Sequence, residues 1–379
     1  MTTCPACGSV RTTEVLRTEP MPVNSCSLLF SVDESLAYPQ RAMALRACPA
    51  CGFFWNADFD AAAVAYDAGY EATQIYSQHF RAYLQKLARR WLDSLDVAPA
   101  SVLEVGCGQG EFLETLSRIT DAKLVGYDPA YRGKASEGII IHATTLPPRA
   151  ARRFDLVVNR MTLEHVPNPA GFLAAMASWV APGGVLITQV PNAARTLDQG
   201  LACDLFYEHV NYFTAPSLEQ ALRAAGFLSN AFETDYAGQH LTAISSRGPD
   251  GGTLTRPPRN LDRLVRSFGG FADAWGITLA QRNAAGRSVW IWGTGSRATT
   301  FMGLLPDPGV VEGAIDINPA RAGSFIAGST CRTHLPNFLE GRRDLSIVVM
   351  NPVYVDEIVV ALRELSAEAE ILPLTGMRG

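Results

Sequence analysis

The sequence predicts an α/β protein whose central part is a doubly wound parallel sheet. Short apolar runs alternate with helical segments between residues 101 and 190, a pattern typical of strands that helices cover on both faces. Two identical CPAC tetrapeptides precede this block, and further apolar runs follow it between residues 288 and 350. We therefore expect a small N-terminal domain at 1–75, the central α/β domain at 76–246 and a C-terminal Rossmann-like α/β domain at 247–379.

The composition is that of a folded globular chain. Of its 379 residues 47% are apolar and 18% are charged, and the formal net charge is -5. This balance offers no general cationic surface for nucleic acid or for an anionic membrane. No apolar run approaches the roughly 20 residues that cross a bilayer, and we recognise no charged-then-apolar leader. We expect a cytoplasmic protein with no nucleic-acid partner and no membrane partner.

The two CPAC tetrapeptides predict a metal site. Each C-x-x-C pair can chelate one tetrahedral ion, and in a reducing compartment Zn²⁺ suits four thiolates best. Because all four positions would be taken by protein, the ion would stabilise the N-terminal domain rather than catalyse. The alternative is a pair of disulfides or free thiols. The expected zinc ligands are Cys4, Cys7, Cys48 and Cys51.

The five apolar runs of the central block are the expected strands. They lie at 101–105, 123–128, 138–143, 154–160 and 183–190. Helices are expected near 110–118, from a start after residue 143, and up to residue 179. Ligands of such sheets bind at the carboxyl ends of the strands.

An aromatic-rich segment joins the N-terminal domain to this block. From about residue 77 to 96 it predicts an amphipathic helix that places Phe80, Leu84, Leu87 and Trp91 on one face. Three tyrosines before the helix either pack at an interface or form a wall over an active site. They are Tyr66, Tyr70 and Tyr76.

The loop after the first central strand reads E-x-G-C-G-x-G, with glycines at positions 106, 108 and 110. It lacks the Gly-Lys-Ser/Thr of a phosphate loop, and its third glycine comes one place earlier than in G-x-G-x-x-G. A diphosphate is therefore disfavoured. Asp128 ends the next strand, where a carboxylate would bind a ribose diol.

The strings VLEVGCGQGEFL, GYDP and FDLVVNRMTLEHVPNP resemble, in order and spacing, the class I methyltransferases that use S-adenosylmethionine. The resemblance implies that the glycine loop approaches the methionyl and ribosyl parts of the methyl donor and that Asp128 binds the ribose hydroxyls. The alternative is an NAD-binding half-domain. The implied cofactor residues are Glu104, Gly106, Cys107, Gly108, Gly110, Asp128, Asn159, Arg160 and Met161.

Two of the six histidines are candidates for an acid–base role, which methyl transfer needs when the acceptor is a poor nucleophile. His165 lies after the fourth strand, where it could also cap a helix or pack. His209 lies in DLFYEHVNYFT, beside Glu208 and among aromatic residues. A histidine near neutral pKa can take a proton and a phenol can steady an oxyanion. The alternative for His209 is a histidine packed among aromatic side chains.

The order of domains resembles the sugar C-methyltransferases that act on 4-keto deoxysugar nucleotides. PMPVNSC, FYEHVNYF, IWGTGSRATTFMGLL and DINPARAGSFIAG are similar to stretches of that family. The resemblance implies that His209 removes the proton alpha to the ketone, while a neighbouring tyrosine and glutamate hold the enolate. By this resemblance the catalytic residues are His209, Glu208, Tyr207 and Tyr212.

The chain departs from that family at several positions. The family's tyrosine two places before the E-H pair is Phe206, so Tyr207 or Tyr212 would have to replace its hydroxyl. The family's H-G-G-S-L-R stretch is YAGQHLTAISSR here, and its W-N is MNPVYVDEI. An enzyme that methylates oxygen, nitrogen or carbon of another small metabolite is therefore the first alternative, and a non-catalytic binding module is the second.

The C-terminal domain follows a linker-like stretch at 247–260. A helix at 261–286 and strands after it predict a second parallel sheet, with a G-T-G-S turn after its first strand. This turn either shapes the acceptor pocket or receives the nucleotide of the substrate. We expect a nucleotide-linked sugar as the small-molecule substrate and a monomer or homodimer. The candidate substrate residues are Tyr70, Tyr76, His165, Arg297, Asn351 and Tyr354.

Overall fold

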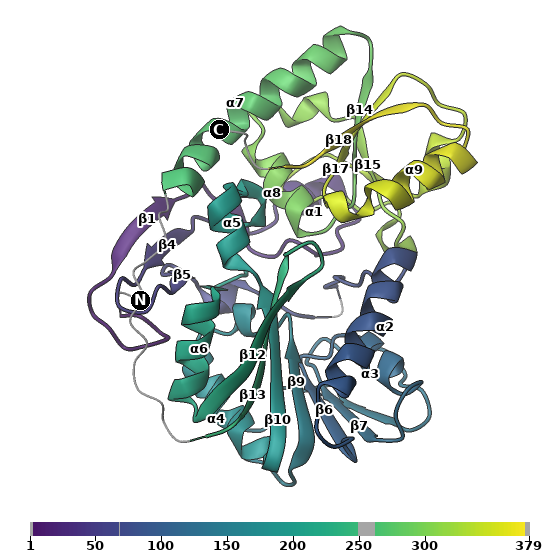
Figure 1. Ribbon diagram of the computed structural model, residues 1–379. Coiled ribbons are helices and arrows are strands. Elements are labelled where there is room, and N and C mark those ends of the chain that lie inside the picture. Colours follow the sequence, from purple (N-terminus) through teal and green to yellow (C-terminus); the bar gives the residue numbers. More distant parts are fainter. Residues whose placement is uncertain (1–2, 68, 249–261, 376–379) are drawn as a thin grey trace.

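Three larger sheets organise the chain in the computed structural model, which describes residues 3–67, 69–248 and 262–375. The central sheet has seven strands in the order β12-β13-β10-β9-β6-β7-β8 (Figure 1). Strands β6 to β10 are parallel, and β13 runs antiparallel to both β10 and β12. The strands are β6 (Ser101–Val105), β7 (Lys123–Tyr127), β8 (Ile139–His142), β9 (Phe154–Arg160), β10 (Val180–Pro191), β12 (Phe227–Asp235) and β13 (His240–Arg247).

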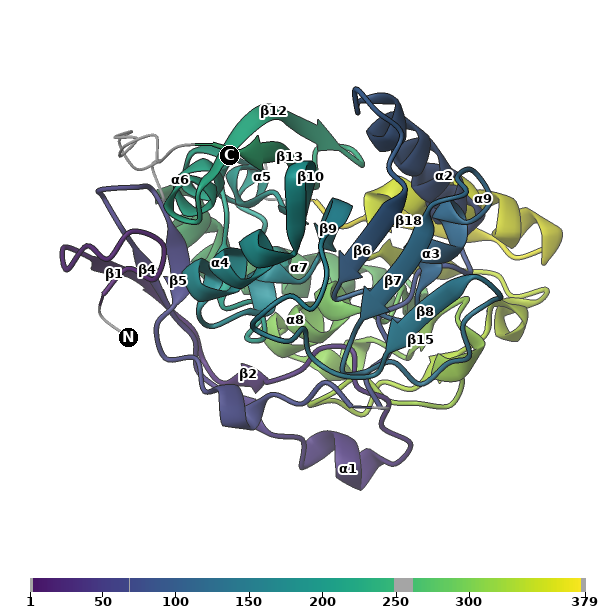
Figure 2. The ribbon, with the colours of Figure 1, turned by 90° about the horizontal axis from the view of Figure 1, so that it is seen from below.

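Helices cover both faces of this sheet, as the continuous apolar runs require. Alternate strand residues pack against α2 and α3 on one face and against α4 and α6 on the other. Figure 2 gives a second view of these layers, seen from below. The helices are α2 (Gln78–Asp93), α3 (Glu111–Leu116), α4 (Pro169–Trp179), α5 (Ala193–Gln199) and α6 (Ala215–Ala224).

Helix α2 confirms the predicted amphipathic helix. Ser77 caps it, because its side chain accepts a hydrogen bond from the backbone of Phe80. The expected apolar face is buried. The helix expected to start after residue 143 is wrong, since residues 143–153 form turns and irregular structure. Pro147 and Pro148 explain this, because proline lacks the N–H that a helix interior needs.

The N-terminal part forms a four-stranded sheet, β1-β4-β5-β11. Strand β11 (Asn211–Tyr212) comes from the segment after the central sheet and pairs with β5. The remaining elements of this part are β1 (Thr13–Arg17), β2 (Met21–Pro22), α1 (Val32–Leu36), β3 (Gln40–Arg41), β4 (Ala44–Ala47) and β5 (Phe54–Asn56).

The C-terminal part is a parallel sheet in the order β16-β15-β14-β17-β18, which confirms the second sheet expected from the sequence. The expected linker falls mostly outside the described residues, and the domain boundaries stay a prediction. The elements are α7 (Asp262–Ala284), β14 (Ser288–Trp292), α8 (Ser296–Leu304), β15 (Gly313–Ile315), β16 (Thr333–His334), β17 (Leu345–Val349), α9 (Val355–Glu364) and β18 (Ala369–Pro373).

The C-terminal sheet lies next to the carboxyl ends of the central strands. The turn of the β12–β13 hairpin, at 236–239, contacts residues of this part through side-chain hydrogen bonds. The C-terminal part is therefore held against this end of the central sheet. Within the described ranges, no helix has both the length and the apolar character needed to span a membrane.

Candidate active site

The glycine loop between β6 and α3 holds three residues in the left-handed region, Gly106, Gly108 and Gly110, with φ of 72°, 56° and 90°. A Cβ on Gly106 would lie 2.0 Å from Oγ1 of Thr162. A Cβ on Gly110 would lie 2.6 Å from Cδ1 of Ile141. The loop therefore needs glycine for both its conformation and its close contacts.

Asp128 fixes this loop from the end of β7. Its Oδ2 accepts a hydrogen bond from N of Gly108 at 2.8 Å, and its Oδ1 accepts one from N of Ala130 at 2.8 Å. Burial raises the pKa of Asp128, although these two backbone N–H groups oppose that rise. The half-buried carboxylate thus lies where the sequence predicts a ribose contact.

Two buried acceptors lie beneath the loop without partners. Glu104 is 1% exposed, and its Oε1 lies 3.7 Å from Nη1 of Arg160. Its Oε2 and the Oδ1 of Asn159 have no hydrogen-bond partner among the described residues. Burial raises the pKa of Glu104 to about 8, despite the opposing charge of Arg160. Unpaired buried acceptors beside a glycine cradle fit a ligand that carries an ammonium group, as the methionyl part of S-adenosylmethionine does.

The loop after β9 packs against the glycine loop. Met161 has φ of 48°, and its N donates to O of Gln189 at 2.8 Å. Thr162 donates from Oγ1 to O of Gly106 at 3.4 Å. Strain at a non-glycine residue is common where a structure positions a ligand. These contacts bring the segment that leads to His165 next to the glycine loop.

The side chain of Cys107 is buried and points into the core. A Cβ on Gly126 would lie 2.6 Å from its Sγ, and the residue is part of the apolar layer under α2 and α3. Only the backbone of Cys107 faces the loop. Arg160 also turns inward, since its guanidinium lies 4.7 Å from the ring centre of Phe112.

His165 and His209 meet as perpendicular rings whose centres are 4.6 Å apart. Nδ1 of His165 lies 2.7 Å from the hydroxyl of Tyr66 and 3.2 Å from O of Glu208. Burial lowers the pKa of both histidines, and His165 lowers that of His209 further. Both rings are therefore neutral near pH 7. His209 also lies edge-on to Phe206, with ring centres 4.8 Å apart.

Glu208 turns away from His209, as the alternation of side chains in an extended segment allows. Its Oε2 accepts a hydrogen bond from Nδ2 of Asn24 at 3.1 Å, and its Oε1 accepts one from N of Ser25 at 3.2 Å and another from the Ser25 hydroxyl. Its carboxylate thus ties the N-terminal part to the histidine segment. Burial, with a smaller effect of Glu208, raises the pKa of Tyr70.

Tyr207 and Tyr212 do not offer the free hydroxyl that was expected of them. The hydroxyl of Tyr207 accepts a hydrogen bond from N of Asp60 and donates to O of Asp58. The hydroxyl of Tyr212 is bonded to both backbone groups of Phe206, each at 3.1 Å. Both phenols serve packing in this structure.

Two other phenols, Tyr66 and Tyr70, lie near the histidines, and the hydroxyl of Tyr66 contacts His165 directly. Their ring centres are 5.1 Å apart, and the ring of Tyr66 lies edge-on to His165 at 5.4 Å. Sequence reasoning placed Tyr66 only as a possible wall residue, because nothing local links it to a histidine 99 residues later. By contrast, the side chain of Tyr76 is 44% exposed.

Glu164 is the residue that sequence reasoning missed. It is 1% exposed, and its Oε2 has no hydrogen-bond partner among the described residues. Burial raises its pKa to about 8. One carboxylate oxygen of Glu164 and one ring nitrogen each of His165 and His209 lie within 4.8 Å of one another. In the sequence, the position of Glu164 directly before His165 is the one feature that points to a role at this site.

A small pocket of about 10 Å³, room for about one water molecule, adjoins this segment. It brings together three parts of the chain: the N-terminal segment around Ser25, the segment at 206–208, and helix α8 through Thr299 and Thr300. Ser25 also accepts a hydrogen bond at its O from the Thr299 hydroxyl, at 2.9 Å. The C-terminal part therefore contacts the segment that precedes His209.

Three candidate substrate residues lie instead at the contact between the C-terminal part and the β12–β13 turn. Arg297 donates from Nε to Oδ1 of Asp204 at 2.5 Å and from Nη2 to Oε1 of Gln239 at 3.0 Å. Asn351 accepts from Nε2 of Gln239 at 2.9 Å. Tyr354 bonds to the hydroxyl of Tyr236 and to Gln74.

The G-T-G-S turn after β14 repeats the arrangement of the glycine loop. Asp316, which follows β15, accepts hydrogen bonds at Oδ2 from N of Thr294 at 2.8 Å and from its hydroxyl at 2.7 Å. Gly293 adopts φ of 96° in this turn. The second sheet thus also has a glycine turn held by the acid at the end of the next strand.

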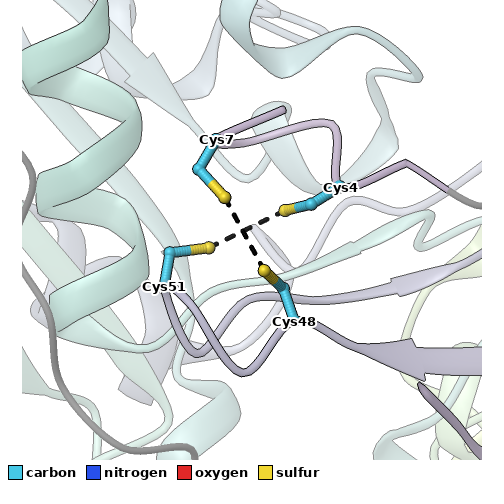
Figure 3. Close-up of side chains that lie close together, drawn as sticks. All are labelled: Cys4, Cys7, Cys48 and Cys51. Carbon is cyan, nitrogen blue, oxygen red and sulfur yellow. Dashed lines mark hydrogen bonds between the residues drawn. The ribbon is translucent and has the colours of Figure 1, made fainter. Parts of the chain in front are cut away.

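The four CPAC cysteines converge as the sequence predicts (Figure 3). Sγ of Cys4 lies 3.7 Å from that of Cys51, and Sγ of Cys7 lies 3.6 Å from that of Cys48. All four are free, so the disulfide alternative is not adopted. Zn–S bonds of about 2.3 Å in a tetrahedron give sulfur separations of about 3.8 Å. The cluster can therefore hold a zinc ion.

Comparison with known proteins identifies the central part. Residues 76–228 match the family described as a methyltransferase domain. The match begins just before α2 and ends in β12. This part of the chain is therefore similar to methyltransferase domains, and its fold is the class I methyltransferase fold that the sequence predicted.

Curated relatives resemble the same part of the chain. Trans-aconitate 2-methyltransferase of Streptomyces avermitilis is 29% identical over 184 residues, which are 41% of this chain and 67% of that protein. Ubiquinone biosynthesis O-methyltransferase of Thiobacillus denitrificans is 32% identical over 114 residues, which are 27% of this chain and 49% of that protein. The chain thus spans two thirds of the first relative and about half of the second.

Solved structures give a similar coverage. An S-adenosylmethionine-dependent methyltransferase from Clostridium acetobutylicum aligns with 46% of this chain and 96% of its own, at a TM-score of 0.36 and 12% identity. A methyltransferase from Haloferax volcanii, solved with the Trm112 activator, aligns at a TM-score of 0.38 and 12% identity over 46% of this chain and 96% of its own.

Proposed function

We propose that this protein transfers a methyl group from S-adenosylmethionine to carbon of a small molecule, namely a 4-keto deoxysugar nucleotide. The observation that supports the proposal most is the pair of perpendicular neutral imidazoles, His165 and His209. His165 lies in the segment that follows the glycine-loop contact of Thr162. A methyl group bound to a sulfonium is a reactive donor, so the protein needs mainly to align the acceptor and remove a proton.

The residues around the glycine loop would hold the methyl donor. Gly106, Gly108 and Gly110 let the backbone approach it, and Asp128 would bind the ribose hydroxyls. The unpaired acceptors of Glu104 and Asn159 would receive its ammonium group. In this proposal Arg160 and Met161 border the site through their backbone, and the side chain of Cys107 makes no contact.

His209 would act as the base in this reaction. It is part-buried and neutral near pH 7, and among the described residues its ring contacts the rings of His165, Phe206 and Tyr212 without a side-chain hydrogen bond. It would take the proton alpha to the ketone, which leaves an enolate. Burial keeps Tyr66 and Tyr70 protonated by raising their pKa, so their hydroxyls can donate hydrogen bonds to the enolate oxygen.

Glu208 would then position rather than catalyse, because its carboxylate is bound by Asn24 and Ser25. Tyr207 and Tyr212 would support the same segment through packing. Arg297, Asn351 and Tyr354 would fix the C-terminal part over the site, where the nucleotide of the acceptor would lie. A structural Zn²⁺ held by the four CPAC cysteines would stabilise the N-terminal part.

Methylation of an oxygen acceptor is the second candidate. Two observations favour it: Phe206 stands where the sugar C-methyltransferases have a tyrosine, and one group of curated relatives carries the name O-methyltransferase. In that case His209 would deprotonate a hydroxyl group instead of a carbon. The acceptor would still lie next to the ring of His209.

A labelled-methyl assay distinguishes these functions. The protein would be incubated with S-[methyl-¹³C]adenosylmethionine and thymidine diphosphate-linked 4-keto deoxysugars, and in parallel with phenolic and carboxylic acceptors. We expect a ¹³C-methyl group on a sugar carbon and a loss of at least 100-fold in kcat for His209→Ala.

The controls separate the remaining outcomes. Label on oxygen would support the second candidate, and donor binding without transfer to any acceptor would indicate a binding module. His334→Ala is the matched control, because His334 lies in the C-terminal sheet against Phe338. Full turnover of His209→Ala would exclude His209 as the base.

A further inference from the structure

The proposed base has an electrostatic difficulty that the proposed function does not resolve. His209 is surrounded by Phe206 and His165, and both burial and the second imidazole oppose its protonation. A base with so low a proton affinity removes a proton from carbon poorly, because the driving force for proton transfer is small. A negative charge close to the imidazolium would offset this.

Glu164 is placed to supply that charge. It follows β9 in the short helix Leu163–His165, and a carboxylate oxygen lies within 4.8 Å of ring nitrogens of both His165 and His209. Its side chain is 1% exposed, and Oε2 has no hydrogen-bond partner among the described residues. Burial of an unpaired oxygen costs free energy of folding, so its presence calls for an explanation such as a role in catalysis.

The other acid of the segment cannot take this role. Glu208 has its carboxylate bound by Asn24 and Ser25, and it reaches the histidines through its backbone carbonyl, which lies 3.2 Å from Nδ1 of His165. The charged groups that act on Glu164 are Arg160, which favours its carboxylate, and Glu208, which opposes it.

We propose that Glu164 is a positioning residue whose carboxylate stabilises the imidazolium form of His209. This inference rests on the proposed function of His209. In the step concerned, the C–H bond alpha to the ketone breaks, its electron pair passes to the ketone oxygen as an enolate, and the proton goes to the ring of His209. The carboxylate of Glu164 remains charged and offsets the new positive charge, as the acid of a catalytic triad does.

The inference predicts a dependence on pH that a structural role would not produce. Glu164 has a raised pKa of about 8, so its carboxylate forms only as the pH rises through that value. We expect kcat to increase between about pH 7 and 9 and then to level off. In Glu164→Gln this limb should disappear and kcat at pH 9 should fall 10-fold to 100-fold, while the donor Kd is unchanged.

A measurement without any acceptor keeps this test separate from the proposed function. In protein labelled with ¹³C-histidine, the ring signals of His209 should change near pH 8 when Glu164 loses its proton. The change should be absent in Glu164→Gln and partly restored in Glu164→Asp. Glu219→Gln is the matched control, because Glu219 on α6 is also buried with an unpaired Oε2 and lies in another part of the fold.

Three results would overturn the inference. The first is a His209 signal that does not respond near pH 8, and the second is the same response in Glu164→Gln. The third is a second metal ion per chain, beyond the zinc of the cysteine cluster, that is lost in Glu164→Gln, because the three groups would then be ligands. A normal His209 response without methyl transfer to any acceptor would instead contradict the proposed function.

Discussion

Glu208 accepts hydrogen bonds from the backbone and the hydroxyl of Ser25, a residue 183 positions earlier in the chain. Both residues line the small pocket next to the segment at 206–208, together with Thr299 of helix α8. The surroundings of the proposed base are therefore assembled from all three parts of the protein, whereas the site that we propose for the methyl donor is formed by loops at the carboxyl ends of the central strands. The predictions below test these two sites separately.

Asp128→Ala should weaken the binding of S-adenosylhomocysteine. The variant removes the carboxylate that holds N of Gly108 and that would bind the ribose, so we expect a 10-fold to 100-fold higher Kd, or about 1.4–2.7 kcal/mol. Calorimetric titration measures this. Asp155→Ala is the control, since Asp155 accepts similar hydrogen bonds from Ser101 at the amino ends of the central strands. Unchanged affinity in Asp128→Ala would contradict the ribose assignment.

Gly106→Ala should abolish donor binding and lower the stability. The new Cβ would lie 2.0 Å from Oγ1 of Thr162, and φ at this residue is 72°, so the loop must shift. We expect a loss of about 2–4 kcal/mol in the free energy of unfolding, measured by urea denaturation. Gly269→Ala, in helix α7 with no atom within 4 Å of the added Cβ, should instead be neutral or stabilising.

Glu104→Gln should raise the stability of the protein and weaken its binding of the methyl donor. Burial raises the pKa of Glu104 to about 8, so the folded protein binds this proton more tightly than the unfolded chain does. Its contribution to stability is complete below pH 4.5 and is lost as the pH rises toward 8. The variant should therefore gain Tm relative to the wild type between pH 6 and 8.5, yet bind S-adenosylhomocysteine more weakly. A Tm difference that is independent of pH would contradict the raised pKa.

Cys48→Ala should release the zinc ion proposed for the cysteine cluster. Removal of one thiolate opens the tetrahedral site, and structural zinc contributes strongly to the folding of the segment that binds it. We expect about one zinc per chain in the wild type, less than 0.2 in the variant, and a Tm lower by more than 5 °C. Elemental analysis and thermal unfolding measure these changes. Cys331→Ala, a buried cysteine outside the cluster, should keep its zinc.

Phe206→Tyr should speed C-methylation if the acceptor is a 4-keto sugar. The ring of Phe206 lies 4.8 Å from that of His209 and lines the small pocket, so an added hydroxyl could donate a hydrogen bond to the enolate. Loss of one such donor costs roughly 100-fold or more in other enzymes, and we expect a gain of at least 5-fold in kcat here. A gain confined to oxygen acceptors would favour the second candidate.

The central sheet and the glycine loop were predictable because their signals are local. The spacing of the apolar residues predicts α2 and the strands. The glycines of one short loop predict its left-handed backbone, which Gly106 and Gly108 adopt. The CPAC pairs likewise carry their own ligand spacing. Each of these features depends on residues that are close in sequence or on a fixed motif.

The acceptor site was predictable only in part, because its contacts join distant segments. Nothing in DLFYEHVNYFT indicates that Glu208 meets Ser25 or that Tyr207 reaches Asp58. In an extended segment, neighbouring side chains point to opposite faces. This rule does not predict which residues lie on each face. Glu164 escaped attention for a related reason: its burial beside His209 follows from the folding of two separate loops.

Strand β11 pairs Asn211 and Tyr212 with Trp55 and Phe54 of the N-terminal sheet, only two residues after His209. If the first 75 residues were deleted, this strand would present an unpaired edge with exposed N–H and C=O groups, which invites association with other chains. The segment that carries the CPAC cysteines should thus be required for the rest of the chain to stay folded and soluble. Expressed alone, the methyltransferase domain should aggregate, and supplying the missing segment as a separate chain should restore its solubility.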